Sequence, residues 1–314
     1  MNTEVDPTSP RRQALKVLAG AAAMLAFGTR RAHTSPAPFR LRHILGSCMY
    51  GTTKLAEIVP EVRKSGATHI DIWPRVHGDQ REQMEAMGHE RFAELLSEHG
   101  VKLGMLTHYD LGPFRLQKEM AVAKKLGGTL LIAGSAGPKN LAGKKLKEAV
   151  RSFAERLQPH VAAAAKHELT IGIENHGGAL INSPDSLRWF VDMAKSKHVG
   201  IAMAPYHLPQ DEQLLAKLID DLGPRLVHFY AWQKGMGCHK KLPKEQELLQ
   251  MPGRGKLDFR PLLSALKRSG YAGWTEIFMH PVPRGIPILE KTAKTTDEIN
   301  RARRYLEKCL AETS

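Results

Sequence analysis

From residue 40 onward, short runs of apolar residues alternate with longer segments in which apolar residues recur at helical spacing. The short runs are nearly continuous and rich in β-forming residues, which is typical of parallel strands covered on both faces. Eight such runs predict strands at His43–Tyr50, His69–Trp73, Lys102–Thr107, Thr129–Ala133, Thr170–Glu174, Val199–Met203, Leu226–Tyr230 and Gly273–Phe278.

The segments between these runs predict helices, several of which stop at a glycine. Pro159 lies inside the longest of them and is a candidate for a kink. The closing helix is expected to take Thr296 or Asp297 as its N-cap. The predicted helices are Leu55–Lys64, Glu90–Glu98, Leu116–Leu126, Leu146–Lys166, Ser186–Lys195, Glu212–Leu222, Phe259–Ser269 and Thr296–Leu310.

Eight β–α repeats over about 270 residues predict an α/β fold, a single-domain (β/α)8 TIM barrel spanning residues 39–314. An open, doubly wound sheet is the alternative. No Gly-x-Gly-x-x-Gly turn follows the first predicted strand, which weakens that alternative. Active sites of such barrels lie at the C-terminal ends of the strands, so these positions are the candidates for chemistry.

Residues 1–38 predict an export signal and a linker. Arg11 and Arg12 precede an apolar run from Ala14 to Gly28, which is short for a bilayer span. The pattern Arg-Arg-x-x-Leu-Lys is similar to a twin-arginine signal, with a basic amphipathic helix as the alternative. We therefore expect recognition by the twin-arginine machinery, a periplasmic or cell-envelope location, and no stable membrane span in the mature protein.

The formal net charge of +14 fits nucleic acid, an anionic surface or an anionic small substrate as a partner. The basic residues are dispersed, so a solvated basic surface is an equally simple interpretation. The densest basic run is Lys234–Lys241. The three cysteines are widely spaced and form no Cys-x-x-Cys pair, so no disulfide framework is expected.

Two glutamates and a set of histidines mark the predicted strand ends. Glu174 and Glu276 stand inside apolar strands, and a buried carboxylate requires a metal, a cation or a hydrogen-bond network. A single histidine at a strand end is usually structural, whereas six around one rim indicate a site. These six are His77, His108, His176, His207, His228 and His280.

Several segments carry a resemblance to a known family. "IGIENH", "VHFYAW", "PGRGKLDF" and "GWTEIF" resemble the sugar phosphate isomerase/epimerase superfamily, the xylose isomerase-like barrels. The resemblance covers nearly everything after residue 40. It implies a divalent metal held by a Glu on strand five, an Asp on strand six, a His on strand seven and a Glu on strand eight.

The implied ligands fall on Glu174, Ala204, His228 and Glu276, so one carboxylate is replaced by a methyl group. With water or His207 filling the gap, the remaining ligands could still hold Mn²⁺, Zn²⁺, Mg²⁺ or Co²⁺. A metal-free pocket, in which the two glutamates act alone, is the competing interpretation.

The resemblance implies an exported sugar isomerase or epimerase. Glu174 and Glu276 are the expected catalytic residues, moving a proton through an enediolate. A lyase or dehydratase and a non-catalytic carbohydrate-binding protein are the alternatives. A DNA-repair nuclease is not expected, because that chemistry needs more metals and carboxylates than the strand ends offer; the oligomeric state stays open. The candidate substrate-binding residues are Trp73, His108, His176, Trp232 and Lys234.

Overall fold

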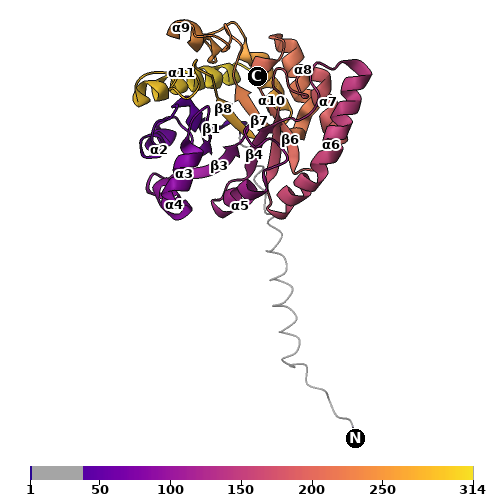
Figure 1. Cartoon of the computed structure of the whole chain (residues 1–314), viewed down its shortest axis with the longest axis horizontal. Coiled ribbons are helices and arrows are strands. Elements are labelled where there is room, and N and C mark those ends of the chain that lie inside the picture. The colour runs from indigo at the N-terminus through magenta and orange to yellow at the C-terminus, as the bar shows by residue number, and fades with distance from the viewer. Residues whose placement is uncertain (2–37, 314) are drawn as a thin grey trace. The chain divides into compact units, whose positions relative to one another are not determined.

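The computed structural model describes Met1 and residues 38–313. In the described part, eight parallel strands pair each with the next, and β8 pairs with β1 to close the barrel (Figure 1). The predicted TIM barrel is confirmed, and the open sheet is wrong. The strands are β1 Arg42–Gly46, β2 His69–Ile72, β3 Lys102–Thr107, β4 Leu130–Gly134, β5 Thr170–Glu174, β6 Val199–Met203, β7 Leu226–Ala231 and β8 Trp274–Ile277.

Helices surround the strands, and the closing helix packs beside α2 and α10, which brings the two ends of the barrel together (Figure 1). The helices are α2 Leu55–Lys64, α3 Gln80–Met87, α4 His89–Glu98, α5 Gln117–Lys125, α6 Gly143–Lys166, α7 Pro184–Met193, α8 Glu212–Leu222, α9 Lys244–Glu247, α10 Phe259–Arg268 and α11 Thr292–Ala311.

The local sequence explains where these elements lie. Every residue of β6 is buried, because the barrel interior covers one face of the strand and the helices cover the other. Helix α7 begins at Ser183, whose hydroxyl accepts a hydrogen bond from the backbone N–H of Ser186, with Pro184 in the first turn. Helix α8 begins in the same way at Asp211. These caps fix where the chain leaves the strand ends.

The largest differences from the predicted boundaries are at the end of β1 and the start of α11. Strand β1 ends at Gly46 and a short 3-10 helix follows, where the Ser47 hydroxyl accepts a hydrogen bond from the Trp73 backbone N–H. Helix α11 begins at Thr292, one turn earlier than expected. Thr296 is therefore inside the helix, where its hydroxyl donates to the buried carboxylate of Glu61 instead of capping the N-terminus.

The sequence pattern also missed helices. Helix α3 buries only Gln80 and Met84, which is too little apolar surface to give a helical pattern. Helix α9 is a single turn. Helix α6 continues through Pro159, the candidate for a kink.

Among the described residues, no helix combines the length and the apolar character that crossing a membrane requires. All three cysteines of the chain are buried and free. The export signal and linker predicted for residues 1–38 lie outside the described residues, apart from Met1 and Pro38. Export therefore stays a prediction.

Candidate active site

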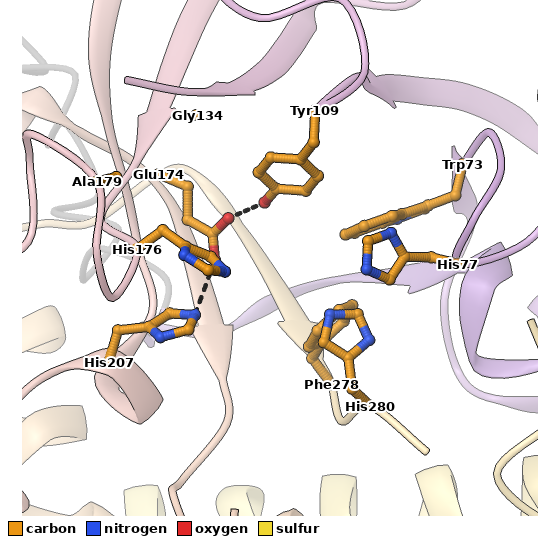
Figure 2. A pocket seen from close by; sticks show the side chains of 10 residues that line it. All are labelled: Trp73, His77, Tyr109, Gly134, Glu174, His176, Ala179, His207, Phe278 and His280. Carbon is orange, nitrogen blue, oxygen red and sulfur yellow. Dashed lines mark hydrogen bonds and ion pairs between the residues drawn. The ribbon is translucent and has the colours of Figure 1, made fainter. Parts of the chain in front are cut away.

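A cavity of about 260 Å³ opens where the strands end. Figure 2 shows that its side chains form two groups on opposite sides, one around Glu174 and the other around Trp73. The cavity is smaller than the pockets of about 300–1,000 Å³ that bind drug-sized ligands, so it suits a small molecule. The lining residues are Trp73, His77, Tyr109, Gly134, Glu174, His176, Ala179, His207, Phe278 and His280.

Glu174 ends β5 and turns its carboxyl group into the cavity. The hydroxyl of Tyr109, which follows β3, donates a hydrogen bond to Glu174 Oε2 (Figure 2). Nε2 of His207 lies 3.8 Å from Oε1 of the same carboxyl. Burial raises the pKa of Glu174 well above its ordinary value, because the ionised form loses its hydration. The result is a carboxyl group that gives and takes protons nearer to neutral pH.

Four imidazole rings line the cavity in two pairs. The rings of His176 and His207 lie 4.1 Å apart, and those of His77 and His280 stack at 4.4 Å. Burial lowers the pKa of His77 to about 4 and that of His207 to about 3. It also lowers the pKa of His176 and of His280. All four rings are therefore neutral near pH 7, and each has one N–H to donate and one nitrogen to accept.

An apolar wall completes the cavity. Trp73 stacks on Phe278 with ring centroids 5.3 Å apart, and both side chains are buried. Trp232 packs behind the wall, against His207 and His280, and its indole N–H donates to Gln250 Oε1 at 3.0 Å. Trp73 therefore forms part of the cavity lining, while Trp232 supports the histidines.

Glu276 and His228 lie deeper in the barrel than the sequence predicts. Both side chains are fully buried, and Glu276 Oε2 is 3.3 Å from His228 Nε2 without hydrogen-bond geometry. Gly46 leaves room for the carboxyl group, because a Cβ atom there would collide with Glu276 Oε1. Burial, and then the charges of Asp71 and Glu174, raise the pKa of Glu276 well above its ordinary value. Tyr230, two residues after His228 on β7, packs against the His228 ring with centroids 4.2 Å apart and is the register partner of Glu276 on β8.

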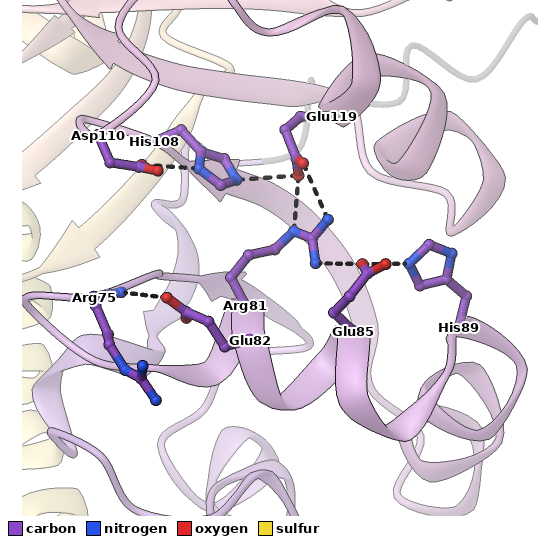
Figure 3. A network of polar contacts seen from close by, with 8 residues as sticks. All are labelled: Arg75, Arg81, Glu82, Glu85, His89, His108, Asp110 and Glu119. Atoms are coloured by element: carbon purple, nitrogen blue, oxygen red, sulfur yellow. Dashed lines mark hydrogen bonds and ion pairs between the residues drawn. The ribbon is translucent and has the colours of Figure 1, made fainter.

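His108 belongs to a different group of side chains, drawn in Figure 3. Its Nε2 lies 3.1 Å from Glu119 Oε2, and its Nδ1 lies 3.1 Å from Asp110 Oδ1. Arg81 donates to both oxygens of Glu119, at 2.8 and 3.0 Å, and to Glu85. This network ties β3 to α3 and α5, so it holds the barrel wall together beside the cavity.

The structure thus brings together part of the predicted site. Glu174, His207, Trp73 and His176 line one cavity. Lys234 is exposed, and its backbone N–H donates to Gln210 Oε1 at 2.8 Å.

Six lining residues had no role assigned from the sequence: Tyr109, Phe278, the stacked pair His77 and His280, and the small residues Gly134 and Ala179. The strand ends pointed to the histidines, but the hydrogen bond from Tyr109 joins residues 65 positions apart and has no sequence signal.

The sequence profile of the xylose isomerase-like TIM barrel matches residues 59–309. The chain belongs to the xylose isomerase-like TIM barrel family. None of the curated proteins matches it in sequence. This member of the xylose isomerase-like family therefore has to be compared through its fold.

Three of the solved structures with the same fold have names that state an activity or a bound metal. The apo form of 3-keto-D-glucoside 4-epimerase from E. coli superposes with a TM-score of 0.64 at 16% identity, covering 84% of this chain and 100% of that one. The IOLI protein with a zinc atom gives 0.64 at 16% identity, covering 87% and 99%. A probable 3-DHS dehydratase from Bacillus anthracis gives 0.63 at 11% identity, covering 85% and 99%. At these identities the likeness shows the fold alone.

The family and the zinc-bearing neighbour imply a divalent metal, but the donors of this xylose isomerase-like chain do not fit one. At the end of β6 stands Ala204, whose backbone exchanges two hydrogen bonds with the side chain of Asn175. Glu174 is engaged by Tyr109, and Glu276 is fully buried beside His228 and is not among the residues that line the cavity. Within the described part of the chain, no group of three or more His, Cys, Asp and Glu side chains is placed to hold an ion.

Proposed function

We propose that the chain is an enzyme that moves a proton on a carbon beside the carbonyl group of a small carbohydrate, giving isomerisation or epimerisation. One observation carries the proposal: the buried carboxyl of Glu174 faces the cavity, accepts a hydrogen bond from Tyr109 and lies 3.8 Å from His207. A carboxyl with a raised pKa, oriented by a second group and shielded from water, is suited to general acid–base catalysis.

The reaction begins at Glu174. Its carboxylate takes the proton from the substrate carbon, the C–H bond breaks, and the electron pair moves to the carbonyl oxygen as an enediolate forms. The hydroxyl of Tyr109 holds the carboxylate in position, and the neutral His207 beside it has an N–H for the developing oxyanion. A neutral imidazole polarises a carbonyl without giving up its proton completely, which avoids a costly buried charge.

The opposite side of the cavity supplies the second group. His77 and His280 are stacked across from Glu174, beside Trp73 and Phe278 (Figure 2). The N–H of one of these neutral rings gives its proton to the carbon from this side, which inverts the centre, and the ring regains a proton as Glu174 releases the one it took; this is epimerisation. A proton returned to the neighbouring carbon gives isomerisation. The flat, apolar face of Trp73 provides the surface on which a sugar ring packs.

Solved structures with the same fold support a reaction of this class. One solved structure with the same fold is named as 3-keto-D-glucoside 4-epimerase. Elimination of water from the same enediolate is the second candidate: Glu174 passes the proton it has taken to the leaving hydroxyl, and a neutral ring of the neighbouring His176–His207 pair hydrogen-bonds that oxygen. The neighbour named as a probable dehydratase supports that alternative.

Proton exchange with solvent tests the proposal. The full chain is incubated in D₂O with a panel of keto sugars and 3-keto glycosides, and proton NMR follows the signal of the carbon beside the carbonyl. The wild type is expected to exchange this proton, and Glu174→Gln to lose at least about 100-fold in rate. Glu155→Gln, an exposed change on α6, is the control. If no substrate exchanges although sugars bind, the chain is a binding protein.

We also propose that the enzyme acts outside the cytoplasm. The support is the sequence pattern alone, Arg11 and Arg12 followed by the apolar run to Gly28. Fusing residues 1–38 to a reporter, with Arg11→Lys and Arg12→Lys changed together as the control, tests this. Export of the wild-type fusion and retention of the variant are expected; equal export of both would refute a twin-arginine route.

A further inference from the structure

Arg284 is a partly buried cation in the loop that carries the cavity residue His280. It lies four residues after His280, in the loop that joins β8 to α11. Its guanidinium donates to the carbonyl oxygens of Pro281 at 2.7 Å and Cys238 at 3.3 Å, and to Cys238 Sγ at 3.1 Å. Among residues 38–313 it forms no ion pair with a carboxylate. A partly buried arginine held by neutral acceptors alone retains the capacity to bind an anion.

The neighbours of Arg284 connect it to the cavity wall. Cys238 Sγ, which accepts from Arg284, lies 3.1 Å from the hydroxyl of Tyr206. The Tyr206 ring stacks on Trp232 at 3.9 Å and meets the ring of His207 at 4.8 Å. The guanidinium is therefore held in a fixed position between the loop of His280 and the layer behind His207, and little conformational entropy is lost when it binds a ligand.

The charge of Arg284 reaches the cavity. It contributes, after burial, to the lowered pKa of His77, His176, His207 and His280, which all line the cavity. Among the lining residues of the described chain, Glu174 is the one carboxyl, and its hydrogen-bond donor is Tyr109 rather than Arg284. The positive charge of Arg284 is therefore not paired with a lining carboxylate.

We propose that the cavity takes a sugar acid, whose carboxylate pairs with Arg284 while its carbonyl end lies against Glu174. This inference rests on the proposed function and adds the substrate class. One planar guanidinium matches one carboxylate in a bidentate pair, whereas a phosphate group usually recruits several cations or a helix N-terminus. The volume of about 260 Å³ suits one monosaccharide unit.

Binding of matched sugars to the full chain tests this inference. The probes are glucuronate, glucose and glucose 6-phosphate, and titration calorimetry gives the dissociation constant of each for the wild type, Arg284→Gln and Arg284→Lys. Lys240→Gln, a change of an exposed cation in the loop after β7, is the control. We expect glucuronate to bind the wild type at least about tenfold more tightly than glucose, with an advantage that shrinks as salt is added.

The variants separate the outcomes. Arg284→Gln is expected to lose the preference for glucuronate but to bind glucose as before, and Arg284→Lys to restore part of it. Equal binding of glucuronate and glucose by the wild type, or equal weakening of both by Arg284→Gln, would overturn the inference. A preference for glucose 6-phosphate over glucuronate would also overturn it. Failure of the proposed function would be seen in a different measurement. In that case no proton exchange would depend on Glu174, whether or not the protein preferred glucuronate to glucose.

Discussion

The hydroxyl of Tyr109 donates a hydrogen bond to Glu174 Oε2 and thereby joins the ends of β3 and β5 across the cavity wall. A buried carboxylate without a donor is costly, so this bond both fixes the carboxyl and stabilises its ionised form. The bond therefore affects catalysis and pH dependence together.

Removing that hydroxyl provides the first prediction. Tyr109→Phe is expected to slow proton exchange about tenfold, since a hydrogen bond to a charged group is worth about 1.5–3 kcal/mol. Loss of the donor raises the pKa of Glu174 further, so the pH at which the rate falls on the acid side moves upward. The measurement is the exchange rate across pH 5–9. Tyr305→Phe, on α11, is the control and is expected to leave the profile unchanged.

The second prediction concerns the side of the cavity opposite Glu174. Because His77 and His280 are stacked, either ring can replace the other, so both are changed to asparagine together. Exchange initiated by Glu174 is expected to persist within about tenfold of the wild type, whereas epimer formation falls by about 100-fold or more. NMR resolves both quantities in one sample. If the exchange rate and the rate of epimer formation fell by the same factor, the two sides of the cavity would not have separate roles.

A third prediction follows from Ala204, which is 0% exposed. Ala204→Asp places a carboxylate where the sequence resemblance implies a ligand, and we expect the free energy of unfolding to fall by about 2–4 kcal/mol because the other donors do not converge there. Added Mn²⁺ or Zn²⁺ is expected to leave the melting temperature of the variant unchanged. Ala204→Asn is the uncharged control. A metal-dependent rise in melting temperature would show that the ligands reach a common centre.

The network in Figure 3 provides a pH-dependent prediction. Although burial opposes it, hydrogen bonds from His108 and Arg81 lower the pKa of Glu119 to about 2. A carboxyl with a lowered folded-state pKa contributes stability above its ordinary value of 4.5, and this contribution is lost as the pH falls toward 2. Glu119→Gln is expected to reduce the free energy of unfolding by about 2 kcal/mol at pH 7.

The same variant also tests the pH at which the stabilisation by the Glu119 carboxylate disappears. Urea denaturation at pH 7, 5 and 3 is expected to show a difference between wild type and Glu119→Gln that is full at pH 7 and shrinks below pH 4.5. Glu94→Gln removes an exposed carboxylate paired with Arg91 and serves as the control, with an effect below about 1 kcal/mol. A constant difference at all three pH values would mean that packing, rather than ionisation, determines the loss.

The barrel could be predicted because its signal repeats. Eight apolar runs, separated by helical segments, leave few other arrangements, and Glu174 stands out as a carboxylate at the end of one run. The direction of neighbouring side chains is harder to predict. Thr107 donates to Asp71 inside the barrel, so with alternating side chains Tyr109 faces the cavity while His108 contacts Glu119.

The depth of a side chain inside the barrel is the second property that the sequence does not predict. Residues two apart on a strand both face inward, one layer above the other, so sequence alone does not tell which layer meets the ligand. His228 and Glu276 illustrate this, because both were expected at the cavity but are fully buried together and do not line it. The loop residues His280 and Arg284 depend on long-range packing that no local pattern encodes.

A crystal structure with a bound keto sugar acid, grown with added Mn²⁺ and recorded with anomalous scattering, tests the central claim most directly. The account predicts the ligand on Trp73, with the carbon beside its carbonyl within hydrogen-bonding reach of the Glu174 carboxyl, and no anomalous peak between Glu174, His228 and Glu276. A manganese ion bound by those three side chains, or a sugar bound away from Glu174, would contradict it.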